Sequence, residues 1–91
     1  MIVKAAKVEV KEVEEEGLIC FLEKQVLLFC LNYIYAGKLV GVNDTFVKLD
    51  DAKVVYQTGS FTSKGYADAQ SVPGNVWYVQ RSAIESFGAG K

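Results

Sequence analysis

Short hydrophobic runs separated by polar turns recur along this chain from residue 24 onward. The run Val26–Leu31 is apolar at every position, which is typical of a strand buried on both faces. In residues 52–58, the positions Ala52, Val54, Tyr56 and Thr58 alternate with Lys53, Val55 and Gln57. This is typical of a strand whose two faces differ in how apolar they are. The runs lie at 24–32, 35–42, 46–49 with 52–58, 76–80 and 83–87. This pattern predicts a mainly β domain, a small five-stranded barrel.

Three stretches lie outside the predicted strands. Residues 1–17 form an N-terminal extension whose apolar positions fit both an alternating strand and a helical stripe, so a helix and an extra strand both stay open. Gly59–Asn75 is a long connector, and loops of this length in compact domains are functional or partly ordered as a hairpin. Gly88–Lys91 is expected to be a frayed tail. All 91 residues are expected to form a single domain.

Two glycines, Gly37 and Gly41, interrupt the second run. Glycine inside a strand marks a sharp bend or a close backbone approach, so we expect this strand to serve both halves of the barrel. The residues Asn43–Asp44–Thr45 then supply turn chemistry, because short polar side chains bond to their own backbone. A further extended run begins at Phe46 and is expected to end at the acidic pair Asp50–Asp51.

Composition limits the class of partner. The net charge of −1 excludes a strongly basic, non-specific nucleic-acid binder but leaves room for a local basic ring. No apolar run reaches the ~20 residues of a membrane helix, so a cytoplasmic protein with no membrane contact is expected. The chain has no histidine and no Cys-x-x-Cys pattern, so a metal site is not expected. Cys20 and Cys30 are interpreted as reduced thiols, with Cys30 buried and inert, while a disulfide stays open.

No catalytic constellation stands out in the sequence. No serine or cysteine has an evident base nearby, and the acidic residues are scattered. No Gly-rich phosphate loop stands between a strand and a helix. We therefore expect a protein that is not an enzyme and has no cofactor.

The stretch from Tyr35 to Ala52 carries the most specific pattern in the chain. An aromatic residue precedes a glycine, a Gly-x-Leu step and a hydrophobic residue follow, and then come Asn, a short loop and a strand ending in acidic residues. The matching residues are Tyr35, Gly37, Leu39, Val42, Asn43, Leu49 and Asp50–Asp51. This stretch resembles the first sequence motif of the Sm and Sm-like RNA-binding proteins.

A second motif of the same family is similar to the end of the chain. There, a hydrophobic strand ends in a basic residue and a short strand of the type Ala-Ile follows. The segment Arg81-Ser82-Ala83-Ile84 matches this pattern, best in the bacterial host-factor branch, with Ser82 in place of a glycine or histidine. The two motifs occur in the family's order, separated by a variable loop.

The resemblance implies a bent, SH3-like (Sm-like) barrel that assembles into a homo-oligomeric ring of about five to seven subunits. It also implies binding of single-stranded RNA, or of DNA, near the pore, where the turns of the two motifs meet. Carried over position by position, the candidate site residues are Asn43, Asp44, Thr45, Phe46, Arg81 and Ser82. Arg81 would hold a phosphate or stack on a base, and Asn43 or Ser82 would bond a base edge.

Each candidate also has a structural interpretation. Phe46 begins a strand and is either a core residue or a stacking residue that faces the pore. Arg81 is either a nucleic-acid contact or the partner of Glu85 in a neighbouring subunit. The last two predicted strands contain no lysine or proline that would block edge pairing. A structural or protein-interaction ring without nucleic-acid binding is therefore the second hypothesis.

Overall fold

The computed structural model describes residues 16–91, which are mainly β. A 3₁₀-helix, η1 (Leu18–Phe21), precedes the sheet, and a second, η2 (Arg81–Ala83), joins its last two strands. The strands are β1 (Gln25–Cys30), β2 (Ile34–Val42), β3 (Phe46–Gln57), β4 (Asp68–Ser71), β5 (Trp77–Gln80) and β6 (Ile84–Ala89). The helix or extra strand expected over residues 1–17 falls almost wholly outside the described residues.

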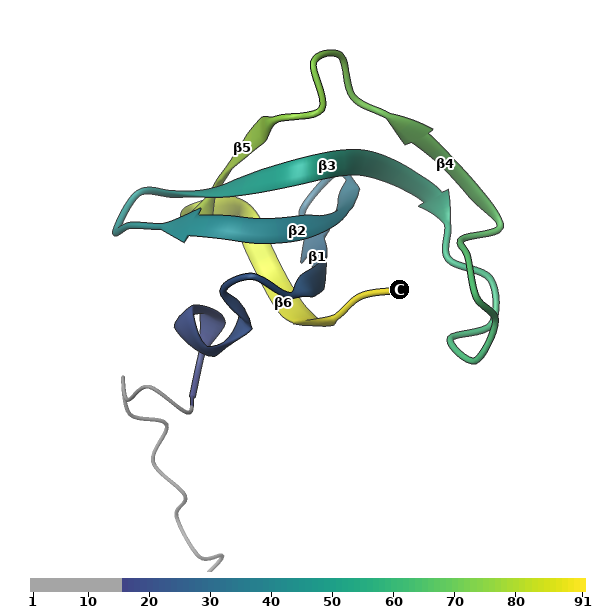
Figure 1. Cartoon of the computed structure of the whole chain (residues 1–91), viewed down its shortest axis with the longest axis horizontal. Coiled ribbons are helices and arrows are strands. Elements are labelled where there is room, and N and C mark those ends of the chain that lie inside the picture. The colour runs from purple at the N-terminus through teal and green to yellow at the C-terminus, as the bar shows by residue number, and fades with distance from the viewer. Residues whose placement is uncertain (1–15) are drawn as a thin grey trace, which may run out of the picture.

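All of these strands belong to one antiparallel sheet with the order β4–β3–β2–β1–β6 (Figure 1). β4 and β5 lie end to end along one edge of β3, β4 against residues 53–57 and β5 against residues 46–49. The mainly β prediction is therefore confirmed. Of the predicted five-stranded barrel, only the mainly β sheet is seen: the described residues form six strands rather than five, and the sheet is not closed. Among them, β6 pairs only with β1 and β5 pairs only with β3.

The additional strand, β4, lies within the long connector expected at Gly59–Asn75. β4 pairs with the second half of β3, so part of this connector is one arm of a hairpin. Just beyond β4, the N–H of Val72 donates to the carbonyl of Ala52 at 3.0 Å, and the carbonyl of Asn75 accepts from the N–H of Ala52 at 2.9 Å. The turn between these bonds separates β4 from β5, because Pro73 has no N–H and Asn75 adopts a left-handed φ of 66°.

The acidic pair Asp50–Asp51 does not end the strand, contrary to the prediction. β3 continues through it to Gln57, with Asp51 in the left-handed region at φ 50°. The register with β2 shifts at this point, as it does at a β-bulge, and the extra residue lets Leu49 and Ala52 both face the same core. One long, bulged strand therefore replaces the two shorter runs that the sequence predicted.

Close backbone approach explains the first of the two glycines in β2. A Cβ on Gly37 would lie 2.9 Å from the carbonyl oxygen of Asp50 and 3.1 Å from the Cα of Ala52. A side chain there would push β3 away from β2, so the prediction of a close approach is confirmed at Gly37. At Gly41 the nearest atom, the Cβ of Lys48, would lie at an ordinary 3.5 Å.

The main core lies on the inner face of the sheet and is sealed at one end by η1. Leu28, Leu39 and Leu49 have no exposed surface, and burying each such side chain contributes roughly 1.5–3 kcal/mol. The buried members are Leu18, Val26, Leu28, Leu39, Val47, Leu49, Ala52, Val72 and Val79. Because Leu27 is also buried, β1 is covered on both faces along Val26–Leu28, as its apolar run predicted.

A second, smaller core lies on the opposite, outer face of the sheet. Leu27, Ala36 and Val55 are buried there against Tyr66, from the β3–β4 connector, and Ala69, from β4. We call this the covered end of the outer face, because part of the connector folds back over the sheet at this point.

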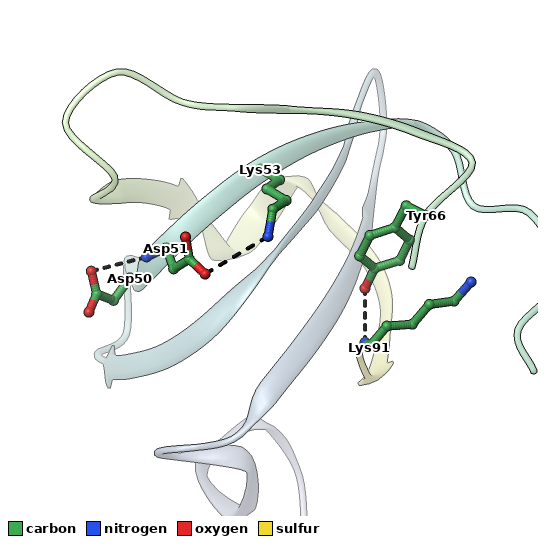
Figure 2. Close-up of polar contacts among 5 residues, drawn as sticks. All are labelled: Asp50, Asp51, Lys53, Tyr66 and Lys91. Carbon is green, nitrogen blue, oxygen red and sulfur yellow. Dashed lines mark hydrogen bonds and ion pairs between the residues drawn. The ribbon is translucent and has the colours of Figure 1, made fainter. Parts of the chain in front are cut away.

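The C-terminal residues fasten this cover, so the expected frayed tail is wrong. β6 continues to Ala89, and the N–H of Gly90 donates to the carbonyl of Gln25 at 2.9 Å. The Lys91 ammonium donates to the carbonyls of Thr58 (2.9 Å), Ser60 (2.6 Å) and Gly65 (2.9 Å). Its backbone N–H donates to the hydroxyl of Tyr66 at 3.0 Å (Figure 2). Carbonyl oxygens that would otherwise face water are thus gathered around one cation.

Candidate nucleic-acid interface

The turn between β2 and β3 is held by the side chain of Asn43. Its Oδ1 accepts hydrogen bonds from the N–H groups of Thr45 and Phe46, both at 2.8 Å. The N–H of Asn43 also donates to the carbonyl of Phe46 at 3.0 Å. This use of a short polar side chain is the reason that asparagine suits the turn. Since Oδ1 is occupied, the amide NH₂ is the group that Asn43 can offer to a ligand.

The second turn is bonded directly to the first. The N–H of Arg81 donates to the carbonyl of Thr45 at 2.9 Å, and its guanidinium Nη1 donates to the carbonyl of Asn43 at 3.0 Å. Pairing of Phe46 with Gln80 in the β3–β5 ladder brings the two chain segments to this position. The turn residues of the two sequence motifs, far apart in the sequence, are therefore adjacent within one chain.

The charge at this junction comes from Arg81, the only arginine in the sequence. A guanidinium carries five N–H donors, and the described hydrogen bond uses one of them. Within residues 16–91, Arg81 makes no ion pair, so the other donors are available to an anion such as a phosphate. Asp44 and Ser82 are both exposed in the same two turns. Asp44 opposes an anion, and the Ser82 hydroxyl can donate or accept.

Phe46 is not a core residue, contrary to one of its two interpretations. Val47 and Leu49 take the core positions of β3, so alternation turns Phe46 and Lys48 to the outer face. Phe46 is 37% exposed. Its ring meets that of Tyr78 edge to face, with centroids 5.3 Å apart and an interplanar angle of 89°.

Lys48 and Tyr78 join Phe46 in a cluster that the sequence did not predict. Lys48 pairs with Tyr78 across the β3–β5 ladder, and its Nζ lies 5.8 Å from the centre of the Tyr78 ring. Tyr78 is 56% exposed. We call Phe46, Lys48 and Tyr78 the aromatic platform. The sequence placed Tyr78 in the hydrophobic run 76–80, but only the register with β3 shows that it lies beside Phe46.

Away from the two turns, Cys30 and Tyr35 pack against the inner core, and Cys20 lies in η1. Both Cys20 and Cys30 are free thiols, and Cys30 is partly rather than fully buried. Burial raises the pKa of the Cys30 thiol, which makes it less reactive near neutral pH, in line with an inert thiol. Burial is also the main influence that raises the pKa of Tyr35, with Cys30 and Tyr33 adding to it and a hydrogen bond with Trp77 opposing it.

Comparisons with known proteins give no name to this site. No protein-family model matches the chain, and no curated protein matches it.

Within residues 16–91, no group of three or more Cys, Asp or Glu side chains is placed to hold a metal ion. In the same part of the chain, no helix has the length and hydrophobicity needed to cross a membrane.

Proposed function

We propose that this protein binds single-stranded nucleic acid, RNA or DNA, at the junction of its two turns. The observation that carries the proposal is the bonding of Arg81 to the carbonyls of Asn43 and Thr45, which joins the residues of both motifs into one site. It is further supported by the outer-face aromatics beside the junction, since single strands are bound by cations and aromatic rings together.

In this proposal Arg81 contacts a phosphate while its Nη1 bond to Asn43 keeps the guanidinium in place. Fixing the guanidinium lowers the conformational entropy that binding would cost. The NH₂ of Asn43 and the hydroxyl of Ser82 donate to base edges or sugar oxygens. Asp44 would disfavour a second phosphate close to the turn, which restricts the path of the strand.

Assembly into a ring of about five to seven copies is the second part of the proposal. β5 and β6 each have one edge that no described residue pairs. Apolar side chains flank these edges, with Val76 38%, Trp77 37% and Phe87 40% exposed. Pairing of β5 in one copy with β6 in the next would complete the open, Sm-like sheet and repeat Arg81 around a circle. Several cations would then act together although the chain carries a net charge of −1.

Titration with a fluorescent oligouridylate and an oligothymidylate at two salt concentrations tests the binding. Affinity should fall with salt by a logarithmic slope of ~0.7 per phosphate neutralised. Arg81→Gln should weaken binding and reduce this slope. Lys64→Gln removes the same charge from an exposed position in the β3–β4 connector and should leave both unchanged. Equal affinity of Arg81→Gln and the wild type would contradict the role of Arg81.

A structural ring without nucleic-acid binding is the second candidate, and the unpaired edges of β5 and β6 favour it. Light scattering gives the mass of the assembly. Val76→Lys places a charge beside the edge of β5 and should reduce the assembly to smaller species. Tyr56→Lys places the same charge on β3, where Tyr56 is 53% exposed, and should keep the wild-type mass. A ring that binds neither oligonucleotide would favour the structural role.

A further inference from the structure

We infer that the aromatic platform of Phe46, Lys48 and Tyr78 binds bases of the single strand by stacking, an inference that rests on the proposed function. The platform lies directly beyond the junction of the turns. Phe46 follows Thr45 in the chain, and it pairs with Gln80, which precedes Arg81. A strand whose phosphate is held at Arg81 therefore has the two aromatic rings within reach of its neighbouring bases.

The shape of the platform suits flat ligands. An edge-to-face pair uses one ring face, and Lys48 lies over the Tyr78 ring, so a base stacks on a remaining ring face or takes the place of Lys48. On the β2 side, Gly41 lies opposite Lys48 in the ladder and adds no side chain that would wall off the platform. A base can thus approach the rings across an open surface.

The charge of the platform selects an anionic strand over a neutral partner. Lys48 lies over the Tyr78 ring, and its ammonium can turn to a phosphate when a base replaces it at the ring face. Lys48 and Arg81 then supply two cations on either side of Phe46. Asp50 lies two residues beyond Lys48 on the outer face of β3, opposite Lys38 in the ladder, and Asp51 pairs with Lys53 at 3.8 Å (Figure 2).

Among the described residues, the aromatic platform is part of neither core cluster. A polar residue would fit these outer-face positions of the strands equally well, and Gln80 occupies one of them. Val47, Leu49 and Val79 already fill the inner core below it. Aromatic rings grouped on a surface, next to cations, are the arrangement that binds successive bases with little dependence on sequence.

Oligonucleotide titrations with base-bearing and abasic strands of equal length test the inference. The wild type should prefer the base-bearing strand, since only bases can stack. Tyr78→Ala and Phe46→Ala should each weaken binding of the base-bearing strand by at least about fivefold and leave binding of the abasic strand nearly unchanged. Tyr56→Ala is the matched control, because Tyr56 is 53% exposed against 56% for Tyr78 and lies on the same sheet.

The outcomes separate this inference from the proposed function. Weak binding by Arg81→Gln together with wild-type binding by Tyr78→Ala and Phe46→Ala would overturn the platform and keep the turn site. Equal losses in Tyr56→Ala and Tyr78→Ala would also overturn it, because the effect would then not depend on position. Failure of the wild type to bind either strand would overturn both. A fully cooperative thermal transition in each variant shows that a loss of binding does not arise from unfolding.

Discussion

The two ends of the outer face of the sheet differ in what covers them. At the covered end, Leu27 and Val55 are 5% and 3% exposed, because Tyr66 and Ala69 pack over them. At the other end, Phe46 and Tyr78 are 37% and 56% exposed. The same strand, β3, runs through both ends. The difference in exposure therefore comes from what packs over the strand at each end.

At the covered end, the apolar surface of the sheet is buried by a connector of the same chain. A connector folds back over the sheet, and the Lys91 ammonium fastens it through bonds to its carbonyls. No described segment does this for the aromatic platform. Exposed aromatic clusters of this kind mark binding surfaces in soluble proteins. The comparison therefore supports the proposal that the aromatic platform serves as a binding surface, whereas the covered end is part of the fold.

The comparison predicts that truncating a side chain costs much more stability at the covered end than at the aromatic platform. Leu27→Ala should lower the free energy of unfolding by about 2–4 kcal/mol, because it leaves a cavity in a buried cluster. Tyr78→Ala should change it by less than about 1 kcal/mol, because the side chain is mostly exposed. Urea denaturation of both variants measures this. A loss at Tyr78 as large as that at Leu27 would mean that the platform is a structural cluster.

A smaller effect is expected when the cover is unfastened. Lys91→Met keeps the aliphatic stem but removes the ammonium, so the carbonyls of Thr58, Ser60 and Gly65 lose their donor. The free energy of unfolding should fall by about 1–2 kcal/mol. Amide hydrogens in residues 58–66 should exchange faster, while those near Phe46 keep their rates. Lys64→Met, which changes an exposed lysine of the same connector, is the control. Unchanged exchange in Lys91→Met would show that the cover holds without the cation.

The smallest expected effect is a loss of stability at alkaline pH, and it arises from Cys30 and Tyr35 beside the inner core. The folded protein has raised pKa values at Cys30 and Tyr35, so the unfolded chain loses these protons first as pH rises. Their contribution to stability is complete below the ordinary thiol pKa of ~8.5 and is lost as pH climbs through the raised values. Tyr35→Phe should flatten the decline, and denaturation midpoints across this range measure it. A decline as steep as in the wild type would place its origin elsewhere.

The sequence predicted the parts of the fold that depend on local pattern. The apolar run of β1, the close approach at Gly37 and the turn at Asn43 follow from residue type and period. It did not predict that β3 runs through Asp50–Asp51, because a bulge there depends on pairing with β2. Nor did it predict β4, because the sequence indicated a hairpin in the connector only as one of two alternatives.

The candidate site shows the same division. Asn43, Thr45 and Arg81 were predicted from two short motifs, and their bonds to one another were found in the structure. Lys48 and Tyr78 were not predicted, because each belongs to an ordinary strand and gains meaning only from the β3–β5 register. Ordering of the tail was missed for a similar reason, since the partners of Lys91 lie in a distant connector.

Backbone amide chemical shifts, followed by NMR during titration with a short oligouridylate, compare both ends of the outer face in one experiment. The account predicts shifts at Thr45, Phe46, Lys48, Tyr78 and Arg81, growing with the oligonucleotide and weakening with salt. It predicts no shifts over residues 58–66 at the covered end. Shifts concentrated at the covered end, or none at the platform under conditions where the strand is bound, would contradict the central claim that the open end is the binding surface.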